Sequence, residues 1–222
     1  MSFQIAIDGP AGAGKSTIAR RVAENLHFVY IDTGAMYRAL GLYFTEKNIP
    51  IDNETEIENN LCGAEISLKM INGEQHVLLN GSDVNDRIRT EKAGMAASKV
   101  STYRAVRKKL VERQQEIAGS LDVVMDGRDI GTVVLKDAQL KIFLTASPHV
   151  RALRRLKDLK ARGQTADLEE IERDICARDE QDMNRTESPL RQAEDAILVD
   201  SSEMTIDEVT ARILELAEQK RM

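Results

Sequence analysis

The sequence predicts an α/β fold in which a parallel sheet of five strands is flanked by helices, with a small antiparallel β insertion and a helical lid. Three observations support this prediction. Short apolar runs recur along the 222 residues, amphipathic helical patterns separate these runs, and one segment between them has a hairpin signal instead. Strands that alternate with helices are typical of a parallel sheet covered on both faces.

The predicted strands are continuous apolar runs, as expected for strands buried on both faces of a sheet. They are QIAI (4–7), FVYI (28–31), VVM (123–125), KIFL (141–144) and AILV (196–199).

Apolar residues that recur every three or four positions predict the helices. Ile18, Val22 and Leu26 follow the first strand, Met36 and Leu40 follow the second, and Val106, Leu110 and Ile117 precede the third. After the last strand, Thr205 and Glu208 have the spacing of a capping box. The helix that they begin carries Ile206, Val209, Ile213 and Leu216.

One stretch departs from this alternation. EISLKMINGEQHVLLNGSDV (65–84) has two β-like segments around Asn72-Gly73, and Asn80-Gly81 supplies a second possible turn. We therefore expect an inserted, β-rich subdomain over residues 60–95. A core of residues 1–59 and 96–222 would surround it, with a lid segment at 151–166.

Composition limits the function classes. The net charge of −6 argues against a general nucleic-acid binder. However, RALRRLKDLKARGQT (151–165) carries a local charge of +5, which fits either a solvated helix face or an anion site.

The sequence has neither a membrane-spanning apolar run nor an export leader, so we expect a cytoplasmic protein without membrane contact. Cys62 and Cys176 are far apart, which fits a reducing compartment. We expect each of them to pack in the core. No His/Cys spacing suggests a zinc site.

GPAGAGKS (9–16) matches the phosphate-loop pattern and stands between a predicted strand and a predicted helix, as that motif requires. Its glycines allow turns that place backbone N–H groups around phosphates, and the helix N-terminus adds a positive dipole end. Lys15 can reach the β- and γ-phosphates, and the Ser16 hydroxyl can bind Mg²⁺. The alternative is a chance match in a glycine-rich turn. The ATP-binding residues would be Gly9, Pro10, Ala11, Gly12, Ala13, Gly14, Lys15, Ser16 and Thr17, with Arg154 and Arg155 from the lid.

Two further predicted strands end in polar sequence, DTGAMYR (32–38) and DGRDIGT (126–132). Ligands of open α/β sheets gather at the carboxyl ends of strands. Asp126 could hold Mg²⁺ through water, or could simply form a turn before Gly127. Arg38 and Arg128 could each bind a phosphate bidentately, although a single Arg is more often a surface residue.

The segment 167–185 predicts a helix whose apolar face becomes charged. Asp167 and Glu170 are spaced as a capping box, and the face of Ile171 and Ile175 continues as Arg178, Asp182 and Arg185. Buried charges are costly unless they are paired or bind something charged. This face therefore either reaches solvent or lines a site for an anionic ligand.

The motifs together resemble the bacterial cytidylate (CMP) kinases, a branch of the nucleoside monophosphate kinases with the P-loop NTPase fold. The resemblance covers essentially the whole chain, including the insertion. It rests on IDGPAGAGKST (7–17), DTGAMYR (32–38), AASKV (96–100), DGRDIGTVV (126–134), KIFLTAS (141–147) and ARDEQDMNR (177–185).

The resemblance implies an ATP-dependent phosphotransferase that converts CMP or dCMP to CDP or dCDP in pyrimidine nucleotide metabolism. It assigns Arg38, Arg128 and Arg185 to the CMP phosphate, Ser98, Arg107 and Asp129 to cytosine, and Arg178 and Asp182 to the sugar. Thr33 and Asp126 would belong to the CMP site, and Mg²⁺ would bind Ser16 and, through water, Asp126. Lys15, Arg38, Arg128 and Arg185 would be catalytic. The resemblance also favours a monomer. It implies that the basic strip 151–165 is a lid over ATP, with Arg151, Arg154 and Arg155 as candidates to close on the nucleotide, and closure would exclude water.

Other readings of the sequence remain open. A kinase of the same fold could act on another small acceptor, but DGRD and the R-D-x-x-D-x-x-R helix disfavour it. A non-catalytic ATP-binding switch module would bind nucleotide without acceptor-dependent turnover, and would leave the second arginine cluster unexplained. A nucleic-acid binder using residues 151–165 is weakest, because the rest of the chain would repel a polyanion.

Overall fold

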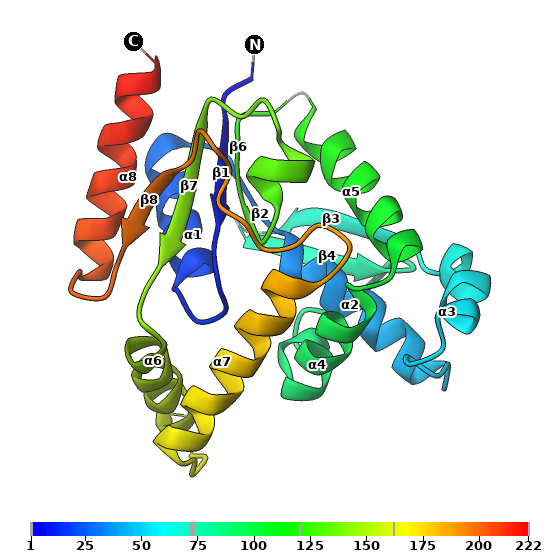
Figure 1. Ribbon diagram of the computed structural model, residues 1–222. Coiled ribbons are helices and arrows are strands. Elements are labelled where there is room, and N and C mark those ends of the chain that lie inside the picture. The colour runs from blue at the N-terminus through cyan, green and yellow to red at the C-terminus, as the bar shows by residue number, and fades with distance from the viewer. Residues whose placement is uncertain (1, 72–73, 120, 162, 222) are drawn as a thin grey trace. The chain divides into compact units, whose positions relative to one another are not determined.

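The computed structural model describes residues 2–71, 74–119, 121–161 and 163–221 (Figure 1). The chain forms two compact units, one of residues 1–30 with 118–222 and the other of residues 31–117. We describe each unit by itself.

The first unit is built on a parallel sheet with the strand order β2-β6-β1-β7-β8. Its strands are β1 (Gln4–Asp8), β2 (Val29–Asp32), β6 (Val123–Gly127), β7 (Leu140–Thr145) and β8 (Ile197–Asp200), and β2 carries the chain into the second unit. In the register, Ile7 lies opposite both Asp126 of β6 and Ile142 of β7. All five predicted strands are confirmed, and the central ones are buried as continuous apolar runs.

The helices of this unit are α1 (Lys15–Leu26), α6 (Pro148–Ala161), α7 (Leu168–Asn184) and α8 (Ile206–Arg221), with a single π-helical turn at Ile130–Val134. The capping box of α7 is confirmed in part, and that of α8 is confirmed in full. Asp167 accepts a hydrogen bond from the N–H of Glu170, and Thr205 and Glu208 bond each other reciprocally.

The core of the first unit lies between the sheet and helices α1 and α8, which also pack against each other (Figure 1). It contains the predicted stripe residues Ile18, Val22, Val209, Ile213 and Leu216. Ile206 was expected on this stripe, but it is 47% exposed. It is the first residue of α8, where the chain is still turning into the helix.

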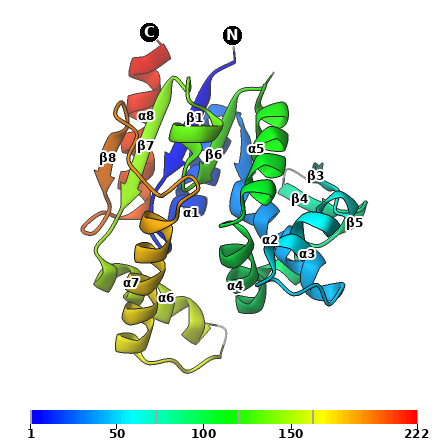
Figure 2. The ribbon, with the colours of Figure 1, turned by 45° about the vertical axis from the view of Figure 1, so that its right-hand side comes forward.

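The second unit joins helices to a three-stranded sheet with the order β3-β4-β5 (Figure 2). Its elements are α2 (Thr33–Glu46), α3 (Glu54–Asn60), a 3₁₀ turn at Leu61–Gly63, β3 (Ile66–Ile71), β4 (Glu74–Leu79), β5 (Ser82–Asp83), a 3₁₀ turn at Arg87–Arg89, α4 (Glu91–Val100) and α5 (Arg104–Ala118). A separate core holds it together, and the predicted Met36, Leu40, Val106 and Leu110 are part of that core.

The antiparallel pairing in this unit confirms a β-rich segment. The predicted turn at Asn72-Gly73 lies outside the described residues. The second predicted turn is present, because Asn80 (φ 48°) and Gly81 (φ 79°) connect β4 to β5 in the left-handed conformation that Asn-Gly hairpin turns require. The assignment of residues 60–95 as an inserted subdomain stays a prediction.

The expected burial of the two cysteines is wrong. Cys62 and Cys176 are both exposed free thiols. Cys176 lies on α7 beside the exposed Ala177, and Cys62 lies in the short turn after α3. In the part of the chain that the structure describes, no helix has the length and apolar character needed to cross a membrane.

Candidate functional site

The phosphate loop joins β1 to α1 through residues 9–14, and its glycines adopt conformations that other residues rarely take. Gly9, Gly12 and Gly14 have φ values of 149°, 76° and 86°. A Cβ atom on Gly9 would lie 1.9 Å from the carbonyl oxygen of Leu144, so only glycine fits there. Gly14 is the N-cap residue of α1, which leaves the first N–H groups of the helix to point toward a bound anion.

Lys15 is buried at the start of α1, where its Nζ donates a hydrogen bond to the Pro10 carbonyl oxygen at 2.6 Å. Burial, together with the positive charge of Arg128, lowers the pKa of Lys15 to about 7, although the charges of Asp126 and Asp8 oppose the shift. A phosphate ligand near this side chain would favour the charged ammonium form.

Ser16 and Asp126 are brought together although they are far apart in the sequence. The Ser16 hydroxyl donates to Asp126 Oδ2 at 2.9 Å, and the Tyr30 hydroxyl donates to Asp126 Oδ1 at 2.8 Å. A hydroxyl and a carboxylate beside a phosphate loop form an oxygen donor set of the kind that Mg²⁺ prefers. The predicted metal residues therefore fit the ion, and Tyr30, which the sequence did not single out, holds the carboxylate.

Asp8 is a second residue that sequence reasoning missed. It precedes Gly9 and is 5% exposed, and its carboxylate accepts the N–H groups of Ile130 and Gly131, each at 2.7 Å. Burial raises the pKa of Asp8 to about 7, against the lowering effect of these two hydrogen bonds. Asp8 thus ties the phosphate-loop strand to the segment that carries Arg128 and Asp129. Its only signal in the sequence is an acid at the end of an apolar strand.

A buried cluster of charged side chains lies in the same unit. Arg128 Nε donates to Asp182 Oδ2 at 2.8 Å. Arg185 lies 3.7 Å from Asp129 and 4.0 Å from Asp182, and the side chains of these three residues are at most 8% exposed. Although burial works in the opposite direction, the charge and hydrogen bond of Arg128 lower the pKa of Asp182. The cluster can therefore present two guanidinium groups to an anion.

The charged face of α7 is confirmed in part. Ile171 and Asp182 are buried as expected, and Arg185 follows the helix as its C-cap residue with only 5% of its side chain exposed. Arg178 is exposed, and its charge acts on Asp182. Asp179 is buried instead. It belongs to the R-D-x-x-D-x-x-R pattern, which was the signal that could have singled it out.

The predicted site residues of the second unit lie on three helices, with Thr33 and Arg38 on α2, Ser98 on α4 and Arg107 on α5. Thr33 is buried at the start of α2, and Arg38 donates to Asp32 at 3.0 Å. Asp32 is also the N-cap residue of that helix.

Arg107, near the start of α5, is 4% exposed, and its guanidinium group lies 5.7 Å from the centre of the Tyr37 ring. The Arg107 Nη1 atom is 3.4 Å from the Ser101 carbonyl oxygen, and the Ser101 hydroxyl donates to the carbonyl oxygen of Ser98. Hence Ser98 and Arg107, predicted from separate sequence segments, are linked by one hydrogen-bonded residue.

The arginines of α6 are directed mainly at protein partners. Arg154 donates to the carbonyl oxygen of Ser201 at 2.7 Å and to its hydroxyl at 3.2 Å. Arg155 is partly buried, and Arg151 is buried. The closing of Arg154 and Arg155 on ATP stays a prediction.

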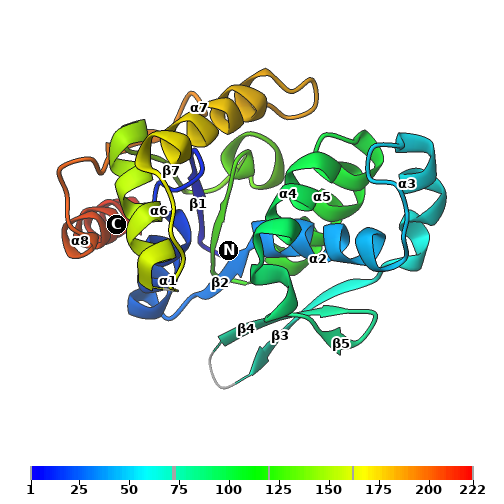
Figure 3. The same cartoon turned by 90° about the horizontal axis from the view of Figure 1, so that it is seen from below.

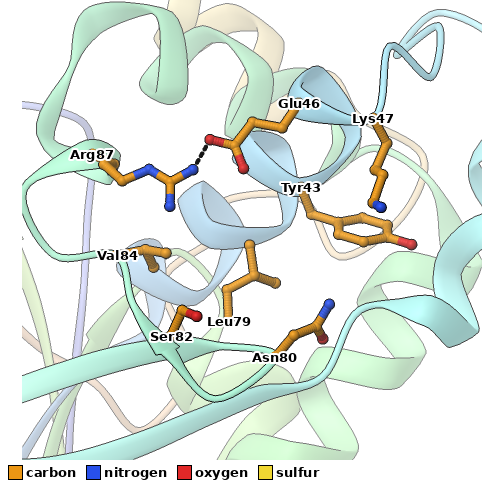
Figure 4. Close-up of a pocket in the computed structure, with 8 residues that line it drawn as sticks. All are labelled: Tyr43, Glu46, Lys47, Leu79, Asn80, Ser82, Val84 and Arg87. Carbon is orange, nitrogen blue, oxygen red and sulfur yellow. Dashed lines mark hydrogen bonds and ion pairs between the residues drawn. The ribbon is translucent and has the colours of Figure 1, made fainter.

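A pocket of about 360 Å³ lies in the second unit, at the end of α2 and beside the β4–β5 turn (Figure 4). Its lining was not predicted to bind nucleotide, and the ion pair between Glu46 and Arg87 neutralises two of its charges. The lining residues are Tyr43, Glu46, Lys47, Leu79, Asn80, Ser82, Val84 and Arg87.

Comparisons with known proteins identify the family to which the chain is similar. The family model described as "Cytidylate kinase" matches residues 5–219. The chain is 50% identical to the cytidylate kinase of Lactobacillus johnsonii over 219 residues, which cover 99% of this chain and 95% of that protein. It is also 50% identical to the cytidylate kinase of Caldicellulosiruptor saccharolyticus, with 96% and 95% of the two chains covered.

Among solved structures, a gluconokinase from Sinorhizobium meliloti 1021 has a similar fold. The TM-score is 0.50 at 14% identity, and the match covers 98% of this chain and 92% of that chain. At this identity the likeness concerns the fold alone.

Proposed function

The chain belongs to the cytidylate kinase family, and from that premise we propose that it transfers the γ-phosphoryl group of ATP to CMP or dCMP, giving CDP or dCDP. The observation that supports this proposal best is the buried cluster of Arg128, Asp182, Arg185 and Asp129 in the same unit as the phosphate loop. Lys15 lies close enough to Arg128 and Asp182 for their charges to act on it.

On the donor side, we propose that residues 9–17 bind the ATP phosphates through backbone N–H groups, with Lys15 at the β- and γ-phosphates. Lys15 would exchange its hydrogen bond to Pro10 for a phosphate oxygen. Ser16 and, through water, Asp126 would hold Mg²⁺, which when bound supplies charge neutralisation at the phosphates. Tyr30 would keep the Asp126 carboxylate oriented. Arg154 and Arg155 remain the proposed lid contacts to ATP.

On the acceptor side, Arg128 and Arg185 are proposed to bind the CMP phosphate. Asp182 holds Arg128 in place before the substrate arrives, so the guanidinium group needs little reordering. Asp182 and Arg178 would also hold the sugar. Phosphoryl transfer of this kind needs no strong general base, because the attacking phosphate oxygen is already anionic near neutral pH. The protein's task is to align the two phosphates and to neutralise charge.

The family resemblance alone assigns Thr33, Arg38, Ser98 and Arg107 of the second unit to the same CMP. Asp129 is proposed to recognise cytosine, because a carboxylate accepts a hydrogen bond from the exocyclic amine of cytosine and repels the carbonyl oxygen of uracil. The Asp129 side chain is 7% exposed. If uracil were bound instead of cytosine, the Asp129 carboxylate would lack a hydrogen-bond donor, and water could not easily take the donor's place.

The remaining expectations are part of the same proposal. The proposed enzyme acts as a monomer in the cytoplasm on ATP and CMP or dCMP, without nucleic-acid or membrane partners. The net charge of −6 supports the lack of a nucleic-acid partner.

The test is ADP release with Mg-ATP across CMP, dCMP, UMP, AMP, GMP and dTMP. Strong turnover with CMP and dCMP and little with the others is the expected result. Binding of ATP without turnover of any acceptor would withdraw the proposal in favour of a switch module.

A further inference from the structure

Arg151 lies in the first turn of α6, and its guanidinium group contacts three separate segments of the first unit. Nε donates to the Ala146 carbonyl oxygen at 2.8 Å, and Nη1 donates to the Ala11 carbonyl oxygen at 3.0 Å. Nη2 forms an ion pair with Asp179 Oδ2 at 2.6 Å. The side chains of Arg151 and Asp179 are 4% and 11% exposed, so the pair is almost fully removed from water.

The contact with the phosphate loop involves packing as well as a hydrogen bond. A Cβ atom on Gly12 would lie 3.4 Å from Cβ of Arg151, so the loop backbone rests against this side chain. Ala11 and Gly12 are in the middle of the loop, between the strand that precedes it and the helix that follows. If the loop shifts when it binds phosphates, the Arg151 side chain must therefore move with it or lose its contacts with the loop.

The other partner, Asp179, is part of the helix proposed to bind CMP. It follows Arg178 directly and is one helical turn before Asp182, which pairs with Arg128. Because an α-helix is a stiff element, a force on the Asp179 side chain also acts on the orientation of its neighbours along α7. Figure 3 shows α6 and α7 side by side, as their contacts require.

We propose that Arg151 and Asp179 are positioning residues that couple the two substrate sites, so that nucleotide in the phosphate loop strengthens the binding of CMP by α7. This inference deepens the proposed function and rests on it. An arginine suits the role because its planar fork bonds three partners at once, which a lysine cannot do with the same geometry.

A simpler explanation is that the pair only holds α6 and α7 together. The chain offers a matched control for that explanation. His149 Nδ1 lies 2.9 Å from Glu172 Oε2, which joins the same two helices at a more exposed position. In the part of the chain that the structure describes, neither residue forms a hydrogen bond or ion pair with the phosphate loop. Loss of this link should loosen the helix pair without affecting communication between the sites.

The experiment measures the Kd of CMP by calorimetry, with and without a saturating, non-hydrolysable ATP analogue and Mg²⁺. The ratio of the two values is the coupling factor, expected to be about fivefold or more in the wild type. Asp179→Asn should reduce that factor at least threefold, on the order of 0.7 kcal/mol, which lies within the range seen for coupling residues. Glu172→Gln should leave it at the wild-type value.

Arg151→Lys is the second variant, and it keeps the charge while breaking the fork. It should reduce the coupling factor as Asp179→Asn does, and the double variant should show no further loss, because both changes break one connection. Either variant alone tests the proposal if the other does not fold. A wild-type factor of one, or an unchanged factor in a folded variant, would overturn it, as would an equal loss in Glu172→Gln. Failure of the proposed function looks different, because the wild type would then not turn over CMP at all.

Discussion

The phosphate loop and the arginine cluster lie in the same unit, but they are built from different parts of the chain. The loop is mainly backbone, shaped by glycines with positive φ and by one buried lysine. The cluster is made of ionised side chains from distant segments that bond each other, such as Arg128 and Asp182. A ligand therefore meets N–H groups already in place at the loop, whereas at the cluster it must compete with existing ion pairs.

This difference has an energetic consequence. The phosphate loop is held in shape by its backbone conformation. A change in that conformation should therefore reduce ligand binding, whereas the conformation itself should depend little on whether a ligand is bound. A buried ion pair is costly to desolvate, and removing one partner leaves the other charge uncompensated. Substitutions at the cluster should therefore reduce both stability and acceptor binding, while substitution of Lys15 should affect the reaction alone.

The largest expected effect comes from Lys15→Met. Loss of the Lys15 ammonium group should lower kcat by about 10³-fold, because it removes charge stabilisation from the transferring phosphoryl group. The unfolding free energy should not fall, since burial disfavours the charged lysine in the absence of nucleotide. Steady-state kinetics and thermal unfolding measure the two quantities. A large loss of stability would contradict the proposed contrast between loop and cluster.

Arg185→Ala should have the second largest effect, a fall of about 10² to 10³-fold in kcat/KM for CMP. Its guanidinium group is buried between Asp129 and Asp182, so the variant should also lose stability. The KM for ATP should stay near the wild-type value. Arg212→Ala is the control, because Arg212 forms an exposed ion pair with Glu215 within α8. A rise in the KM for ATP equal to that for CMP would show that Arg185 is not an acceptor residue.

The two regions also differ in how far the sequence predicted them. The phosphate loop is contiguous, so its residues, glycine conformations and flanking elements could all be predicted from one motif. The cluster depends on segments that are more than 50 residues apart, as Arg128 and Asp182 are, and only the family resemblance put them in one site. The ion pair between Arg128 and Asp182 was not predicted, because the spacing of residues along a helix does not indicate which residue of another segment packs against that helix.

Asp8, Tyr30 and Asp179 show why the remainder of the site was missed. Each is a buried polar residue whose partner comes from elsewhere in the chain, and burial of that kind has no periodic signal. The strands were predicted well, because an apolar run needs no partner to be recognised. The cysteines were placed wrongly for the same reason, since the composition rule for Cys takes no account of a particular helix face.

Asp129→Asn tests base recognition within the cluster. An amide can accept a hydrogen bond from the cytosine amine or donate one to the uracil carbonyl, so the preference for CMP over UMP should fall by about 100-fold. The measurement is the ratio of kcat/KM values for the two acceptors. Glu172→Gln, a carboxylate-to-amide change outside both regions, should leave that ratio unaltered. An unchanged ratio in Asp129→Asn would remove the assignment of Asp129 to cytosine.

The smallest expected effect is the pH dependence of stability at Asp8, which connects the two regions. Its pKa is raised by burial from 3.8 to about 7 in the folded protein, so the folded state binds a proton more tightly than the unfolded state does. The stability that this protonation contributes is complete below pH 4 and is lost as the pH rises through 7. Between pH 5 and pH 8 the wild type should therefore lose about 2 kcal/mol of unfolding free energy that Asp8→Asn does not lose.

Urea unfolding at both pH values gives this difference, with Asp174→Asn as the control because Asp174 is exposed on α7. That control should follow the wild type at both pH values. Equal pH dependence in Asp8→Asn and the wild type would mean that the two N–H groups of Ile130 and Gly131 stabilise the carboxylate enough to cancel its burial. Asp8 would then be a permanent anion between the loop and the cluster, and the connection between the two regions would be as fixed as the loop itself.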